Sequence, residues 1–250
     1  MSEEKKQQLI NPFYSEEKEQ VLAEVQTTEE GLTTAEAEKR LNEYGLNELE
    51  EGEKKSMLAR FLEQFKDLMI IVLLFAAVIS AVVSHEVVDS IIILAVVIIN
   101  AVMGVVQESK AEQAIEALRE MSTPNANVLR DGHILSVKST DLVPGDIVML
   151  EAGDVVPADL RLIEVASLKI EEAALTGESV PVEKELIVID AGEVGIGDRV
   201  NMAYSNSNVT YGRGKGVVVN TGMNTEVGKI AGMLAQADET ETPLKLSLIH

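Results

Sequence analysis

The sequence contains no cysteine and no tryptophan, and aromatic residues make up only 3% of it. Without cysteine, the chain can form neither disulfide bonds nor thiolate metal sites. Positive charge is also scarce, because 21 Lys and Arg residues face 42 Asp and Glu residues and the formal net charge is −21. This balance argues against nucleic acid as a partner, since phosphate binding needs a basic surface. The scarcities exclude disulfide-stabilised domains and disfavour nucleic-acid-binding proteins.

Long apolar runs are present, and two of them lie close together, at residues 68–83 and 87–106. A bilayer-spanning helix needs about 20 apolar residues, so the first run depends on an amphipathic lead-in at the membrane surface. We expect a first transmembrane helix with its lead-in at 56–83 and a second at 87–121, which continues into a charged cytoplasmic extension. A buried helical hairpin in a water-soluble protein is the alternative.

Basic residues flank the two runs, which are preceded by Lys54, Lys55 and Arg60 and followed by Lys110 and Arg119. The short connection between the runs contains neither Lys nor Arg. The positive-inside rule therefore places both termini in the cytoplasm and the connection outside. We expect an integral membrane protein, with the plasma membrane as the favoured location.

The first 55 residues are polar and acidic, and we expect residues 1–55 to form a cytoplasmic helical segment. Helical spacing predicts helices at 15–24 and 33–44. Thr33 is followed three residues later by a glutamate, a pattern typical of a helix N-terminus, and Gly45 is suited to the C-terminus. An acidic linker is expected between this segment and the first run.

Short apolar segments separated by turn residues follow the second run, and they predict a mostly β domain at 122–237. The Asp131-Gly132 pair predicts a hairpin, and further strands are expected at 147–150, 160–165 and 216–219 and a closing helix at 226–237. The expected fold class is therefore an α+β membrane protein with an N-terminal helical segment, a two-helix transmembrane hairpin and a β-rich domain.

Several motifs occur in order along the chain, at residues 62–67, 100–108, 142–148, 153–159, 172–179, 212–214 and 221–230. One of them contains Thr176-Gly177-Glu178-Ser179, which alone would be weak but is specific in this order. With these motifs the chain resembles the P-type ATPases, in particular the calcium-transporting, sarcoplasmic-reticulum-type branch and its bacterial relatives. The resemblance covers nearly all 250 residues and identifies 122–237 with the family's actuator domain.

The resemblance implies a mechanism in which an aspartate is phosphorylated by ATP and then dephosphorylated with the help of the actuator domain. Glu178 matches the glutamate that activates water. This agrees with the chemistry, because acyl-phosphate hydrolysis needs a positioned water and a base. Gly177 permits a tight turn near a phosphate, and Thr176 and Ser179 offer hydroxyls that shape the loop. The alternative is a simple exposed turn.

Other polar residues in the motifs have weaker interpretations. Glu63 matches an acidic position that gates ion entry in calcium pumps, and an interfacial glutamate is the alternative. Asn100 is expected to bond another span in helix packing, and a position facing a polar cavity is the alternative. Pro157 and Asp159 are expected to shape a turn. No residue is expected to bind a metal, and no cofactor is expected to bind this chain alone, whereas a complete pump would use ATP and Mg²⁺.

The chain departs from the family at its end, where 238–250 would be a linker toward a third span, and it contains no Asp-Lys-Thr-Gly phosphorylation motif. We expect a truncated part of an ATP-driven cation pump, with calcium favoured, that is inactive alone. Its expected partners are the lipid bilayer, the missing pump domains and the transported cation, with no nucleic acid. The alternatives are a non-enzymatic, membrane-anchored regulatory fragment and a fragment of a sodium/potassium-type or proton pump.

Overall fold

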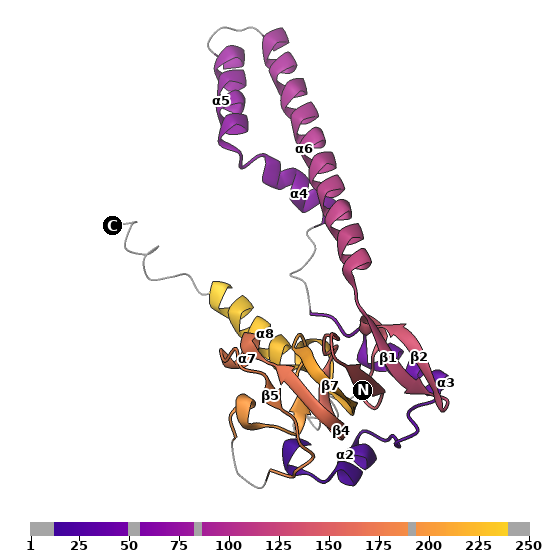
Figure 1. Cartoon of the computed structure of the whole chain (residues 1–250). Coiled ribbons are helices and arrows are strands. Elements are labelled where there is room, and N and C mark those ends of the chain that lie inside the picture. The colour runs from indigo at the N-terminus through magenta and orange to yellow at the C-terminus, as the bar shows by residue number, and fades with distance from the viewer. Residues whose placement is uncertain (1–12, 50–55, 83–86, 190–193, 240–250) are drawn as a thin grey trace. The chain divides into compact units, whose positions relative to one another are not determined.

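A computed structural model describes residues 13–49, 56–82, 87–189 and 194–239. The described residues form two compact units, which Figure 1 shows with their elements labelled. Residues 13–49 and 123–239 make up the sheet unit, and residues 56–122 make up the helical unit. The expected connection at 84–86 and most of the expected linker at 238–250 lie outside the described residues.

The helical unit consists of three helices: α4 (Met57–Gln64), α5 (Leu68–Val82) and α6 (Val87–Ser122). Ser56 caps α4 by accepting a hydrogen bond from the backbone amide of Ala59. Because α4 and α5 meet at a bend of 67°, the amphipathic lead-in and the apolar run are separate helices. The helix α6 is continuous, as the pattern predicts, and its Ile91–Ile115 segment is long and apolar enough to cross a membrane.

Polar side chains join α4 to the charged part of α6. The Arg60 guanidinium forms an ion pair of 2.5 Å with the Glu112 carboxylate, and the Gln64 side chain lies within 3.5 Å of Glu108. A Cβ atom on Gly104 would lie 2.5 Å from the Gln64 side-chain oxygen, so glycine leaves room for this contact. The lead-in is therefore fixed to α6 by charge and by close packing.

The sheet unit is built on one antiparallel sheet with the strand order β2-β1-β3-β7-β4-β5, and β6 pairs with β4. The strands are β1 (Asn125–Arg130), β2 (His133–Lys138), β3 (Ile147–Glu151), β4 (Asp159–Glu171), β5 (Val182–Glu183), β6 (Met202–Ala203) and β7 (Asn208–Asn220). Short helices η2 (Ser139–Asp141), α7 (Ala173–Thr176), η3 (Ile196–Asp198) and η4 (Gly222–Asn224) connect them, and α8 (Glu226–Glu239) follows.

Both faces of the sheet are covered. Successive side chains of a strand point to opposite faces, and on β7 Val218 belongs to one apolar cluster whereas Val217 and Val219 belong to another. All three are fully buried. This arrangement explains why the strand reads as a continuous apolar run rather than as an alternating one.

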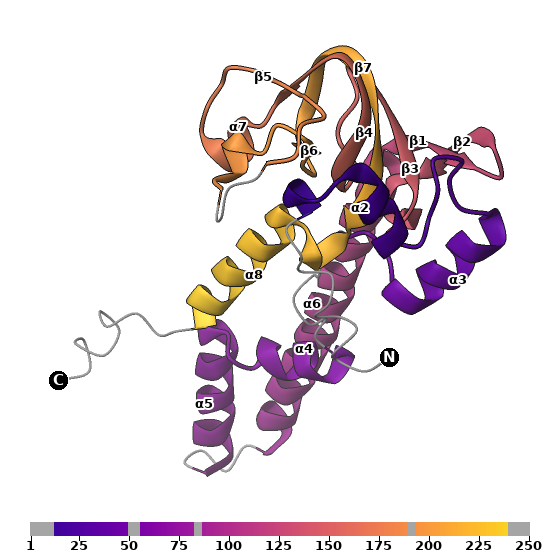
Figure 2. The ribbon, with the colours of Figure 1, turned by 90° about the horizontal axis from the view of Figure 1, so that it is seen from below.

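The N-terminal segment supplies the cover for the second face. It contains η1 (Phe13–Ser15), α2 (Lys18–Glu24) and α3 (Thr34–Tyr44), and Figure 2 shows α2 beside β4. The buried side chains that this segment adds to the cluster around Val217 are Phe13, Tyr14, Val21, Leu22 and Val25. The acidic segment therefore forms part of the core of the sheet unit.

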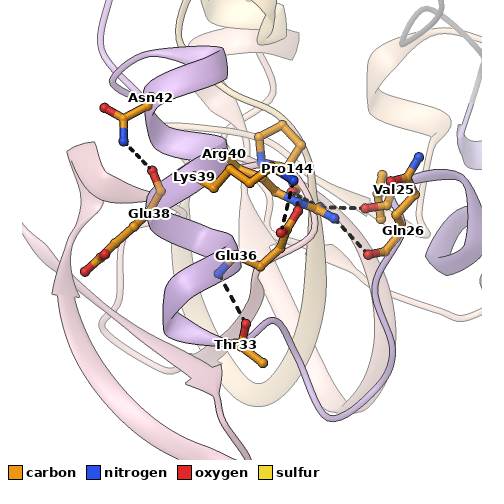
Figure 3. Close-up of polar contacts among 9 residues, drawn as sticks. All are labelled: Val25, Gln26, Thr33, Glu36, Glu38, Lys39, Arg40, Asn42 and Pro144. Carbon is orange, nitrogen blue, oxygen red and sulfur yellow. Dashed lines mark hydrogen bonds and ion pairs between the residues drawn. The ribbon is translucent and has the colours of Figure 1, made fainter.

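Two buried arginines fasten the N-terminal segment to the sheet. The Arg161 guanidinium donates hydrogen bonds to the backbone oxygens of Phe13 and Glu16, both at 3.0 Å. The Arg40 guanidinium, in α3, donates to the backbone oxygens of Val25 at 2.7 Å and Pro144 at 2.8 Å, as Figure 3 shows. Hydrogen bonds from a charged donor to buried carbonyls fix the path of the chain.

Local predictions from the sequence hold in the sheet unit. The Thr33 hydroxyl accepts a hydrogen bond from the Glu36 amide at the start of α3, and Gly45 ends the helix at a φ of 83°. The Asp131-Gly132 pair joins β1 and β2 as an antiparallel hairpin. The strands β4 and β7 have 13 residues each and are longer than predicted, because irregular register steps let them bend and continue.

Candidate functional site

The motif Thr176-Gly177-Glu178-Ser179 lies in the loop that connects β4 to β5. The one-turn helix α7 begins after Glu172 and ends at Gly177, whose φ of 76° is left-handed. A Cβ atom at Gly177 would meet nothing within 4 Å. Glycine is therefore suited to this position by its backbone conformation and not by lack of space.

Hydrogen bonds hold the loop on its N-terminal side. The Thr176 hydroxyl donates to the backbone oxygen of Glu172 at 3.1 Å and accepts from the backbone amide of Glu178 at 3.2 Å. The side chains of Glu178 and Ser179 are exposed. The loop thus presents the exposed Glu178 carboxylate from a backbone whose amide is held by the Thr176 hydroxyl.

A second segment supports the loop from the side. The helix η3 contacts α7, and a Cβ atom on Gly197 would lie 3.3 Å from the Thr176 methyl carbon. Lack of a side chain at Gly197 lets η3 approach closely. The loop therefore rests on a second part of the sheet unit rather than standing alone.

A buried ion pair lies at the base of the loop, and the sequence interpretation missed it. The Lys184 ammonium is 2.6 Å from one carboxylate oxygen of Glu172, and both side chains have an exposure of 0%. Burial raises the pKa of Glu172 and lowers the pKa of Lys184, although the attraction between them opposes both shifts. In a chain so rich in glutamate, no sequence pattern distinguishes Glu172 from its exposed neighbours.

Asp159 has a role that its place in a turn-like motif did not reveal. Its carboxylate accepts hydrogen bonds from the backbone amides of Ser205 at 3.0 Å and Glu226 at 2.8 Å. The second bond satisfies a free amide at the start of α8. Burial raises the pKa of Asp159 to about 6, and this effect outweighs the two hydrogen bonds, which lower it.

The other predicted residues lie elsewhere. Glu63 is half-buried in α4 of the helical unit, whereas the Thr176–Ser179 loop belongs to the sheet unit. Asn100 is exposed on α6. Among the residues that the structure describes, no group of three or more His, Asp or Glu side chains is arranged to hold a metal ion.

Comparison with known proteins identifies two domains in the chain. Residues 120–235 match the P-type ATPase actuator domain, and residues 13–80 match the cation transporter/ATPase N-terminus. The chain is therefore similar to this family both in the sheet unit and across the first part of the helical unit.

Individual relatives agree with the domain matches. The calcium-transporting ATPase 1 of Bacillus cereus is 52% identical over 244 residues, which cover 96% of this chain and 27% of the relative. A calcium-transporting ATPase of Listeria monocytogenes is 51% identical over 236 residues, with 94% and 27% covered. One from Bacillus subtilis is 47% identical over 219 residues, with 88% and 24% covered.

The chain spans about a quarter of the length of these relatives, since 24–27% of each is covered. The matched part holds the N-terminal and actuator domains. The chain therefore belongs to the P-type ATPases.

Proposed function

We propose that this chain supplies the actuator domain of an ATP-driven calcium pump and promotes hydrolysis of the pump's aspartyl-phosphate intermediate. The observation that carries the proposal is the position of Glu178, an exposed carboxylate that follows a left-handed glycine on a supported loop. Because the Glu178 carboxylate is exposed, a loop of this form can bring it into a phosphate site on another domain.

In the proposed reaction, Glu178 accepts a proton from a water molecule that attacks the phosphorus atom. The phosphorus–oxygen bond to the aspartyl carboxylate breaks, and inorganic phosphate leaves. General-base assistance of this kind contributes about 10² to 10⁴ in rate. The roles of Thr176 and Gly177 are to fix the backbone that carries the base, and Ser179 offers a hydroxyl beside it.

We propose that the helical unit crosses the plasma membrane twice, with both termini in the cytoplasm. The helix α6 supplies one span, and the bent pair of α4 and α5 supplies the other, with α4 at the membrane surface. The exposed apolar side chains of α5 and α6 support this assignment, because hydrocarbon would surround them in a bilayer. In this proposal Glu63 lies near the cytoplasmic entry of the ion path.

The identity of the ion is proposed from the names of the three relatives described above, which are all calcium-transporting ATPases. We propose that ATP and Mg²⁺ bind to other domains of the complete pump. The contribution of this chain to the reaction is therefore the base and its loop, coupled to the first two spans.

A chimaera tests the catalytic proposal. In it, the chain replaces the matching segment of the Bacillus cereus relative, and the level of phosphoenzyme formed from ATP is measured with ATP turnover. We expect Glu178→Gln to raise the phosphoenzyme level and to lower turnover at least 100-fold, since the amide cannot accept the proton. Glu183→Gln, in β5 with an exposed side chain, is the matched control. Unchanged turnover in Glu178→Gln would disprove the assignment.

A further inference from the structure

Few backbone hydrogen bonds join the far end of the Glu178 loop to β4. The strand β4 ends at Glu171, and β5 returns to it with only two residues, paired through Lys169 and Ile170. The Lys184 backbone amide adds one hydrogen bond of 2.8 Å to the backbone oxygen of Leu168. Backbone pairing alone is therefore a weak constraint on a loop of this length.

The ion pair between Glu172 and Lys184 joins the two ends of that loop. Glu172 directly precedes α7, and Lys184 directly follows β5. Both side chains are fully buried and their charged atoms are 2.6 Å apart. The second carboxylate oxygen of Glu172 is buried and accepts no hydrogen bond from the described residues. Lys184 is thus the principal partner of this carboxylate.

The backbone of Glu172 is connected to the backbone of Glu178 by a short series of hydrogen bonds. The Glu172 backbone oxygen accepts from the amide of Leu175 at 2.9 Å and from the amide and the hydroxyl of Thr176 at 3.0 and 3.1 Å. The same hydroxyl accepts from the Glu178 amide. A displacement of Glu172 would therefore move the backbone of Glu178 through a single intermediate residue.

Stability alone does not account for two charges at this place. An apolar pair of similar volume is often as stabilising as a buried ion pair, because desolvation offsets the attraction. An ion pair differs from an apolar pair in having one favourable geometry, which fixes the register of one end of the loop against the other. Fixed register is what a general base needs, since a displacement of about 1 Å costs about 10² in rate.

We propose that Glu172 and Lys184 are positioning residues that hold the Thr176–Ser179 loop in the geometry required for dephosphorylation. This inference rests on the proposed function of Glu178. Neither side chain is exposed, so neither touches the phosphate, and both act through the backbone of the loop.

Three variants of the chimaera test the proposal, with dephosphorylation rate and thermal stability measured for each. Lys184→Met leaves a buried carboxylate unpaired and should slow phosphoenzyme decay at least tenfold, with phosphorylation by ATP changed less than twofold. Glu172→Gln keeps an oxygen that accepts from Lys184 and should decay within threefold of the wild type. The double variant Glu172→Met with Lys184→Met should recover thermal stability but not the decay rate.

The exposed pair of Lys169 in β4 and Glu183 in β5, 3.6 Å apart, offers a matched control. Lys169→Met removes the same charge from the adjoining β4 and should leave the decay rate unchanged. Recovery of the decay rate in the double Met variant would overturn the proposal, because the pair would then serve stability alone. A wild-type decay rate in Lys184→Met would overturn it as well.

A measurement without catalysis separates this inference from the function on which it rests. In the 250-residue chain itself, hydrogen exchange of amides 173–180 should be at least tenfold faster in the double Met variant, with β3 still protected. If Glu178→Gln has no effect on decay, the proposed function fails. If Glu178→Gln slows decay and the double Met variant exchanges and decays as the wild type does, only the positioning role fails.

Discussion

The sheet unit and the helical unit both contain many apolar residues, but many of these side chains are buried in the sheet unit, whereas most are exposed in the helical unit. Val217 in β7 has an exposure of 0%, whereas Phe75 in α5 has an exposure of 68%. In the sheet unit the protein supplies its own apolar surroundings on both faces of the sheet. In the helical unit the apolar surface faces outward, which is the arrangement that a bilayer stabilises. The difference is what the proposed membrane location of the helical unit requires, because that unit leaves most of its apolar side chains without a cover of protein.

The two units also differ in how they place charge. The sheet unit buries arginine, lysine and carboxylate side chains and gives them specific partners, as at Arg40, Arg161 and the pair of Glu172 and Lys184. In the helical unit, α5 contains only uncharged residues, and α6 has Asp89 in its first turn and further charged residues only after its apolar run. Buried charges in the sheet unit therefore define its geometry, and we expect it to respond sharply to their removal.

The largest effect should follow from releasing the N-terminal cover. Arg40→Met leaves three backbone oxygens, of Val25, Gln26 and Pro144, without their donor. We expect a loss of about 3–5 kcal/mol in the free energy of unfolding of the sheet unit. Lys39→Met, at a neighbouring exposed position, should change it by less than about 0.5 kcal/mol.

Tyrosine fluorescence during urea unfolding measures this loss. All four tyrosines lie in the sheet unit and the chain has no tryptophan, so the emission reports on that unit alone. Equal stabilities of the Arg40 and Lys39 variants would contradict the role given to the buried arginine.

The next largest effect should follow from placing an aspartate in the helical unit, compared with the same substitution at a similarly exposed residue of the sheet unit. Phe75 in α5 and Ile134 in β2 have exposures of 68% and 61%. Phe75→Asp should cost about 3 kcal/mol in apparent membrane insertion, because a carboxylate enters hydrocarbon. Ile134→Asp should cost less than about 0.5 kcal/mol in stability, because water already surrounds that side chain.

The insertion cost is obtained from the ratio of inserted to uninserted chain after cell-free synthesis with lipid vesicles. Unimpaired insertion of the Phe75→Asp chain would argue that α5 does not contact lipid.

A smaller effect is the pH dependence contributed by Asp159. Its pKa is raised from 3.8 to about 6 in the folded chain, so the folded state binds more protons between these values. The contribution to stability is present below pH 3.8 and is lost as the pH rises through about 6. A pKa difference of about two units limits the contribution of Asp159 to the free energy of unfolding to about 3 kcal/mol.

The difference in unfolding free energy between the wild type and Asp159→Asn, measured from pH 4 to pH 7, isolates this group. It should fall as the pH rises. The same difference for Asp131→Asn should stay nearly constant over this range and should fall only as the pH drops below about 4, because the hydroxyl and amide of Thr34 lower the pKa of Asp131 from its ordinary value of 3.8. A flat profile for Asp159 would mean that its carboxylate is not desolvated.

Much of the local structure could be predicted from the sequence because its causes are local. The Thr33 cap, the stop at Gly45 and the Asp131-Gly132 hairpin each depend on residues within a few positions of one another. The continuous helix α6 follows from an uninterrupted helical pattern. The motif around Glu178 was visible because several separated motifs occur in the same order as in a known family.

The remaining features could not be predicted, because they depend on contacts between distant residues. The hydrogen bond from Arg161 to Phe13 joins residues 148 positions apart. No local pattern shows that an acidic N-terminal segment covers a sheet face, or that Glu172 is buried with Lys184. The bend of 67° between α4 and α5 is accompanied by the ion pair from Arg60 to Glu112, which are likewise distant in the sequence.

The most direct test of the central claim is the rate of phosphoenzyme decay after a chase with unlabelled ATP, compared between the chimaera and its Glu178→Gln variant. We predict decay at least 100-fold slower in the variant, with phosphoenzyme formation changed by less than about twofold. Decay at the wild-type rate in the variant would show that Glu178 is not the base, and the supported loop would then need another function.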